Sequence, residues 1–212
     1  AHFRSRDLSE AKQFGGEYII APMDETPYAL QKCMLAKNKV YSTDQQEDTE
    51  FLFNVETITT YNNLPQMMEV ARTPNGVQGA VFGRVDFSGS MGLARNAIDT
   101  DQITDYVRKT GAACKESGLD LVVGGAVAIS SLPELNKMRD THLTRFETRK
   151  VVFGADSATL PEMAQGLQKT VYFELLWLQN KRDHYETIRD EDFARIKMTR
   201  DRWDQIKSGM LV

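Results

Sequence analysis

The stretch from Phe51 to Gly92 constrains the fold of this chain more than any other part of the sequence. It holds two apolar runs of strand length, FLFNV and AVFGRV, and a segment with helical apolar spacing, NNLPQMMEVA, lies between them. Because two strands joined through a helix need a crossover connection, they favour parallel pairing. The sequence therefore predicts a parallel strand–helix–strand unit at its centre.

Each of the two predicted strands ends in a carboxylate. Glu56 closes the first apolar run and Asp86 closes the second. The C-terminal ends of neighbouring parallel strands meet at one edge, and in a (β/α) barrel the chemistry takes place at that edge. Two hard oxygen ligands there suit Mg²⁺ or Mn²⁺. The alternative is that Glu56 caps the following helix and Asp86 orders its turn.

Three more apolar runs, EYIIAPM, LDLVVGGAVA and RFETRKVVF, alternate with helix-like segments. Five strands that alternate with helices predict an α/β fold, either a parallel barrel or a doubly wound sheet. A complete eight-stranded barrel typically needs about 250 residues. The chain has 212 residues and too few predicted strands to close such a barrel by itself.

The pattern changes near residue 158. Thr159 and Glu162 have the spacing of a capping box at the start of a long amphipathic helix, and a further helix is expected at about residues 189–206. We therefore predict two parts, a partial barrel over residues 1–158 and a C-terminal helical extension over residues 159–212. The extension is expected to pack on the barrel or on a neighbouring subunit.

Charge and composition exclude several classes of partner. The net charge of −4 and the pI near 5.5 give no electrostatic case for binding nucleic acid or an anionic membrane. No apolar run approaches the roughly 20 residues of a transmembrane helix. The two cysteines, Cys33 and Cys114, lie far apart in helix-like segments, and we expect reduced thiols in a cytoplasmic protein.

A glycine-rich segment, GRVDFSGSMG, directly follows the second central strand. Glycines let backbone N–H groups approach an anion, and serines add hydroxyl donors. Ser88, Gly89 and Ser90 are therefore candidates for binding a carboxylate or a phosphate. The alternative is a tight loop without a ligand.

Other charged residues lie near predicted strand ends. Asp24 and Glu25 follow the first strand, where either is a candidate general base or an acid that simply favours a helix N-terminus. Arg84 is two residues before Asp86, so on a strand it shares that face and either contacts substrate or pairs with an acid. Lys150 is a candidate Schiff-base lysine or a surface charge.

Taken together, the segments IIAPMDETPYAL, NVET and GRVDFSGSMG resemble the HpcH/HpaI aldolase/citrate lyase family. This family belongs to the phosphoenolpyruvate/pyruvate-binding barrel superfamily, and the resemblance covers roughly residues 1–158. It implies a (β/α)8 TIM-barrel type of fold that lacks the first strands in this chain. The resemblance also implies that Glu56 and Asp86 are metal ligands and that Ser88, Gly89 and Ser90 hold the carboxylate of the substrate.

The activity implied by the resemblance is that of a metal-dependent aldolase or carbon–carbon lyase. With Mg²⁺ or Mn²⁺ it acts through the enolate of a pyruvate-like 2-oxo acid, while Asp24 or Glu25 helps to move the proton and Arg84 contacts the substrate. Family members are commonly oligomers, which implies a homo-oligomer here. The substrate-binding arginine or lysine of the family comes from early strands that this chain lacks.

Two other functions compete with this one. A non-catalytic barrel subunit or ligand-binding scaffold is favoured by the incomplete barrel and disfavoured by the intact pair of Glu56 and Asp86. A Schiff-base lyase that uses Lys150 would be revealed by borohydride trapping with a 2-oxo acid.

Overall fold

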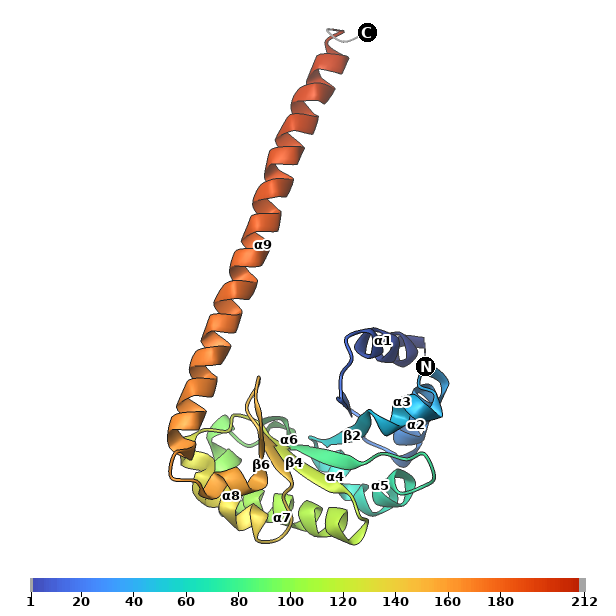
Figure 1. Cartoon of the computed structure of the whole chain (residues 1–212), viewed down its shortest axis with the longest axis vertical. Coiled ribbons are helices and arrows are strands. Elements are labelled where there is room, and N and C mark those ends of the chain that lie inside the picture. Colours follow the sequence, from blue (N-terminus) through green and yellow to red (C-terminus); the bar gives the residue numbers. More distant parts are fainter. Residues whose placement is uncertain (1, 210–212) are drawn as a thin grey trace. The chain divides into compact units, whose positions relative to one another are not determined.

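The computed structural model describes the backbone of residues 2–209 and the side chains of residues 5–209 (Figure 1). The chain divides into two compact units, Ala1–Gln168 and Lys169–Val212. The first unit contains the sheet and almost all of the buried side chains. The second unit consists of the greater part of one long helix.

The first unit is built on a six-stranded half-barrel sheet with strand order β1-β2-β3-β4-β5-β6. Neighbours among the first five strands are parallel, and β6 is antiparallel to β5. The predicted parallel unit at the centre of the chain is therefore confirmed. The strands are β1 (Tyr18–Ala21), β2 (Glu50–Val55), β3 (Gly79–Gly83), β4 (Asp120–Gly124), β5 (Arg145–Glu147) and β6 (Val152–Gly154).

The strand predicted at RFETRKVVF is a short hairpin. Thr148 N donates to Val151 O over 2.9 Å, which closes a turn with Arg149 and Lys150 at its tip. The apolar alternation continues on both sides of this turn, so the sequence suggested one strand where the structure has β5 and β6. Lys150 is consequently an exposed residue of a hairpin turn.

Helices connect the strands and cover one face of the sheet, where Figure 1 shows α5, α7 and α8. Helix α2 begins where the sequence predicts, because Thr26 Oγ1 accepts a hydrogen bond from Ala29 N and Pro27 occupies the first turn. The helices of the first unit are α1 (His2–Gln13), α2 (Pro27–Val40), α3 (Thr43–Glu47), α4 (Ile58–Asn62), α5 (Leu64–Ala71), α6 (Arg84–Ser90), α7 (Asp101–Glu116) and α8 (Leu132–Arg139). Short 3₁₀ helices are η1 (Arg95–Asp99), η2 (Ile129–Ser131) and η3 (Ala155–Thr159).

The main core lies between the sheet and these helices. Successive side chains of a strand point to opposite faces. The residues that face the helices belong to one large buried cluster, with Phe53, Val55, Phe82, Val123 and Phe146 from the sheet. The opposite face carries a small buried cluster of its own, formed by Leu52, Val81 and Val122.

The helix-free face of the sheet is curled. The guanidinium of Arg145, on β5, lies 4.4 Å from the ring centroid of Tyr18, on β1. Its Nη2 is also 2.8 Å from Asp120 Oδ2 and 3.6 Å from Glu50 Oε2. A side chain can bridge five strands in this way only if the sheet bends around it. This curvature is the beginning of a barrel, and it makes the helix-free face the inner one.

The long helix α9 (Met163–Lys207) begins four residues after the predicted capping residue Thr159. The two helices predicted in this region are a single helix of 45 residues. No glycine or proline interrupts it after Gly166, so its polar middle continues the helix. Met163 and Leu167 are buried in the core of the first unit, whereas most apolar side chains from Val171 onward are exposed.

None of the helices within residues 2–209 is both long enough and apolar enough to cross a membrane.

Candidate functional site

Glu56 and Asp86 line the same hollow, which has a volume of about 810 Å³. They reach it from different elements, since Glu56 directly follows β2 and Asp86 lies in α6, which follows β3. The pairing of β2 with β3 brings the carboxyl ends of both strands together. The other residues that line the hollow are Pro22, Met23, Thr57, Val85, Gly89, Leu93 and Arg95.

The carboxylate of Glu56 is held by two donors. Its Oε1 accepts a hydrogen bond from Met23 N, and its Oε2 accepts one from Asn54 Nδ2, each over 3.0 Å. Met23 adopts a φ of 56°, an uncommon value for a residue with a side chain. Each carboxylate oxygen has two acceptor sites, so both keep capacity for a further ligand. Thr57, rather than Glu56, caps the helix that follows, because its Oγ1 accepts from Thr60 N.

Asp86 lies in the first turn of a helix, which differs from the predicted strand end. β3 ends at Gly83 and α6 begins at Arg84, because helical spacing buries Phe87 and Ser88 while Asp86 stays exposed. Among residues 5–209, no hydrogen bond or ion pair engages the side chain of Asp86. Its carboxylate is therefore available to a ligand in the hollow.

Arg84 does not share a face with Asp86, because residues two apart on a helix point in nearly opposite directions. Its side chain is fully buried, and Nη1 lies 2.6 Å from Asp99 Oδ1. The Nε and Nη2 atoms donate to Gly124 O and Gly125 O over 3.2 and 3.1 Å. Burial lowers the pKa of Arg84, and the charge of Asp99 opposes that effect. Of the two predicted roles, pairing with an acid is therefore the one observed.

Ser88, Gly89 and Ser90 form the end of α6 rather than an open loop. Ser88 is fully buried. The hydroxyl of Ser90 accepts from Ile58 N over 2.8 Å and donates to Phe87 O over 2.7 Å, so its hydrogen-bonding capacity is largely used within the protein. Of the three, only Gly89 lines the hollow, and the space next to its Cα is open.

Asp24 and Glu25 lie beside the hollow without lining it. Asp24 is fully buried. Glu25 Oε1 accepts a hydrogen bond of 2.6 Å from Thr57 Oγ1, and its backbone oxygen accepts one from Asn63 Nδ2. Because Thr57 does line the hollow, Glu25 reaches it only through that hydroxyl. The role of either acid as a general base stays a prediction.

The family model for HpcH/HpaI aldolase/citrate lyase matches residues 1–132 of this sequence. This chain belongs to the HpcH/HpaI aldolase/citrate lyase family. The predicted family and its barrel type of fold are thus confirmed. No curated protein sequence matches the chain.

Several solved structures have a similar fold at low sequence identity. RipC from Yersinia pestis matches with a TM-score of 0.52 and 16% identity, covering 68% of this chain and 63% of its own. A citrate lyase from Burkholderia xenovorans LB400 matches with a TM-score of 0.55 and 19% identity, covering 70% of this chain and 50% of its own. An HpcH/HpaI aldolase from Desulfitobacterium hafniense DCB-2 matches with a TM-score of 0.53 and 10% identity, covering 78% of this chain and 68% of its own. The chain therefore spans only 50% to 63% of the first two structures.

The carboxylates of the hollow fit a hard divalent cation. Glu56 and Asp86 offer carboxylate oxygens in one hollow, and no histidine or cysteine lines it. Carboxylate oxygens with room for water and substrate suit Mg²⁺ or Mn²⁺. No group of three or more His, Cys, Asp or Glu residues that could hold a metal occurs within residues 5–209. A cation here would therefore take its remaining ligands from water and substrate.

Arg95 is a residue of the hollow that the sequence did not single out. It lies exposed in η1, on the same hollow as both carboxylates. Its sequence context, GLARNAID, follows the glycine-rich segment and gives no periodic signal of its own. The structure thus places a cationic side chain at the hollow that differs from the predicted substrate contact, Arg84.

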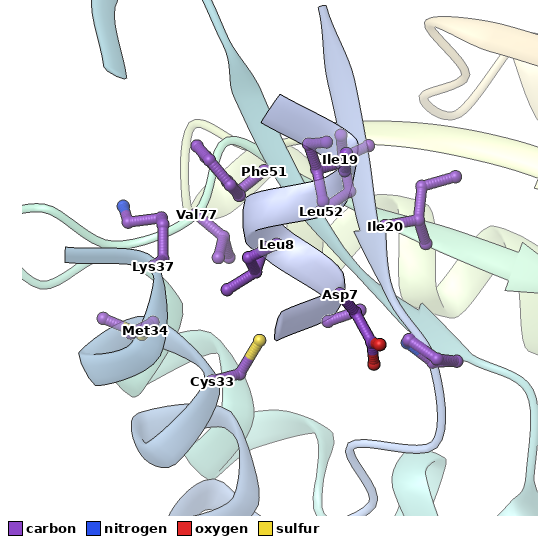
Figure 2. Close-up of a pocket in the computed structure, with 13 residues that line it drawn as sticks. Asp7, Leu8, Ile19, Ile20, Cys33, Met34, Lys37, Phe51, Leu52 and Val77 are labelled. Carbon is purple, nitrogen blue, oxygen red and sulfur yellow. The ribbon is translucent and has the colours of Figure 1, made fainter. Parts of the chain in front are cut away.

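A second cavity, of about 400 Å³, lies among α1, α2, β1 and β2 and is largely apolar (Figure 2). Lys37 is the cationic residue of its lining. The Nζ of Lys37 donates to Asn75 O and Gly76 O over 2.7 and 2.6 Å, and burial lowers its pKa. This lysine therefore anchors α2 to the turn before β3. The polar groups of the candidate site lie in the other hollow.

Replacing Arg84 by methionine should destabilise the fold strongly. The change leaves Asp99, Gly124 O and Gly125 O without their buried donor. Removing one partner of a buried ion pair costs about 3–5 kcal/mol in free energy of unfolding. Urea denaturation of Arg84→Met and of the wild type measures this loss. The matched control is Arg6→Met, because Arg6 forms an exposed pair with Glu10. Equal midpoints for both variants would contradict the structural role of Arg84.

Proposed function

We propose that this protein is a divalent-metal-dependent carbon–carbon lyase that acts through the enolate of a pyruvate-like 2-oxo acid. The observation that carries the proposal is the meeting of Glu56 and Asp86 in one hollow at the carboxyl ends of β2 and β3. Membership of the aldolase/citrate lyase family supports the reaction class. The metal, the substrate and the site residues belong to the proposal.

Glu56 and Asp86 would hold the cation, Mg²⁺ or Mn²⁺. When bound, such a cation acts as a Lewis acid that draws electron density from the carbonyl of the substrate. Met23 N and Asn54 keep the carboxylate of Glu56 in a fixed orientation, so the ligand is in place before substrate arrives. This arrangement reduces the ordering cost of binding.

Arg95 would bind the carboxylate of the 2-oxo acid. Among the residues that line the hollow, Arg95 is the one with a cationic side chain. A guanidinium matches the geometry of a carboxylate with two parallel hydrogen bonds. Gly89 leaves the wall of the hollow open beside the substrate, while the hydroxyl of Ser90 ties the end of α6 to Ile58 N. Glu25 could assist proton movement through the hydroxyl of Thr57.

A non-catalytic barrel subunit is the second candidate function. It is favoured by the half-barrel sheet, in which five strands are parallel, and by the partial coverage of the related structures. Such a subunit would retain the fold and the hollow without turnover. The two candidates differ in whether the protein labilises a C–H bond of its ligand.

Deuterium exchange into the methyl group of pyruvate tests the proposed lyase without knowledge of the second substrate. We expect loss of the methyl proton signal in D₂O with Mg²⁺, and no loss after addition of EDTA, as followed by proton NMR. An exchange rate equal to that of the buffer, from folded protein with Mg²⁺ or Mn²⁺, would contradict the lyase and favour the non-catalytic subunit.

We further propose that α9 pairs with α9 of a second copy of the chain. An apolar stripe at helical spacing runs along it, with side chains about half exposed, at Val171, Leu175, Leu178, Tyr185, Ile188, Phe193, Ile196, Trp203 and Ile206. A helix of 45 residues is about 68 Å long. The longest other helix has 16 residues, so within the described chain only another α9 matches that length.

Charged substitutions in this stripe should reduce the oligomeric state. Phe193→Glu combined with Ile196→Glu places two carboxylates where apolar side chains would pack, whereas Thr187→Glu with Ala194→Glu alters the opposite side of the same helix. Sedimentation velocity should show a smaller species only for the first pair. Identical sedimentation of the wild type and both double variants would defeat the pairing.

A further inference from the structure

A row of four residues crosses the inner face of the sheet at the carboxyl ends of its strands. Gly83 on β3 and Gly124 on β4 are register partners. Glu56 follows β2 on one side of this pair, and Glu147 ends β5 on the other side. Phe146 packs into the core beneath the helices, so its neighbour Glu147 points to the inner face.

The two glycines give room to the two glutamates. A Cβ on Gly124 would lie only 2.7 Å from Glu147 Oε1, and a Cβ on Gly83 would lie 3.1 Å from Glu56 Cβ and 3.7 Å from its Oε2. Each glutamate therefore packs over the glycine beside it. With neighbouring strands about 4.8 Å apart, the nearest oxygens of Glu56 and Glu147 are within about 11 Å of each other.

That span suits one small molecule. An organic acid of a few carbon atoms, with a contact of about 3 Å at each end, bridges a gap of this size. A substrate of this length held near Glu56 would reach Glu147 across Gly83 and Gly124.

Glu147 has the properties of a group that exchanges protons. Within residues 5–209 no hydrogen bond or ion pair engages its side chain, and it is half-buried. The nearest cation on its strand, Arg145, is committed to Asp120. Burial raises the pKa of Glu147 above its ordinary value, and no neighbouring charge contributes to the shift. A carboxyl group of raised pKa is suited to general acid–base work near neutral pH.

We propose that Glu147 is the catalytic residue that moves the proton of the reacting carbon, an inference that rests on the proposed lyase. In one direction the C–H bond next to the carbonyl breaks, its electron pair becomes the C=C bond of the enolate, and the proton passes to a carboxylate oxygen of Glu147. In the other direction the carboxylic acid of Glu147 returns that proton to carbon. No further reactant is needed.

The other acids near the hollow fit this task less well. Glu25 is already the acceptor of the Thr57 hydroxyl, and Asp24 is completely buried. Glu56 accepts from Met23 N and Asn54 Nδ2, which stabilises its charged form. Glu147 combines half-burial, an open carboxylate and a position at the carboxyl end of its strand.

The first experiment compares pyruvate methyl exchange in the wild type, Glu147→Gln and Gly124→Ala. Loss of a general acid–base group costs about 10²–10⁴-fold in rate, so Glu147→Gln should lose at least about 100-fold. Gly124→Ala displaces the carboxylate without removing it and should lose less. Gly154→Ala is the matched control, because a Cβ there would meet nothing within 4 Å. Mn²⁺ affinity should be unchanged in all three variants.

The second experiment needs neither metal nor activity. In metal-free protein with ¹³C-labelled glutamate carboxyls, one signal should titrate above the ordinary glutamate range, vanish in Glu147→Gln and move toward the ordinary range in Gly124→Ala. Deprotonating the methyl carbon requires the ionised carboxylate, so the wild-type exchange rate should rise with pH through that same pKa and then level off.

The outcomes separate the two proposals. Absence of exchange in the wild type would contradict the proposed lyase itself, and this role of Glu147 with it. Exchange in the wild type that persists undiminished in Glu147→Gln would overturn the role of Glu147 and leave the lyase intact. A glutamate titration unaffected by Gly124→Ala would show that the carboxylate does not lie over Gly124 and would also overturn the inference.

Discussion

A positive charge in the protein interior must be satisfied completely, and Arg84 is such a charge. Asp99 neutralises it, and the other N–H groups of Arg84 donate to the carbonyls of Gly124, Gly125 and Ile98 and to the hydroxyl of Ser131. These partners come from η1, from the end of β4 and from η2, so Arg84 joins three segments that surround the end of β3. Removing either charge would leave the other without a partner in the interior, so the ion pair fixes the start of α6. Asp86, one half-turn further on, is thereby presented to the hollow.

Two glycines shape the inner face of the sheet at the carboxyl ends of β3 and β4. Gly83 and Gly124 lie side by side in register, and a methyl group on either would crowd the glutamate beside it. The space that the glycines leave is therefore taken by Glu56 and Glu147, while the layer beneath is filled by Val81 and Val122. The apolar layer keeps the core closed below the two carboxylates.

The parts of the fold that follow from local pattern could be predicted from the sequence. The two central strands and Glu56 at the end of the first follow from apolar runs and a crossover. Asp86 was placed on a strand because GRVDF alternates, but burial of Phe87 favours the helix. Glu147 could not be recognised, because its setting depends on Gly124, which is 23 positions earlier in the chain. The ion pair of Asp99 with Arg84 could not be predicted either, because the two residues are 15 positions apart and Arg84 becomes buried only in the folded chain.

The proposed function depends on a divalent cation that Glu56 and Asp86 bind together. Electron paramagnetic resonance of free Mn²⁺ during titration measures this most directly, in the wild type, Glu56→Gln, Asp86→Asn and a control, Asp156→Asn, whose carboxylate is fully exposed and distant in sequence. We expect one site in the wild type and the control, and loss of tight binding in both site variants with the fold retained. Wild-type affinity in Glu56→Gln and Asp86→Asn would show that these two carboxylates do not bind the cation.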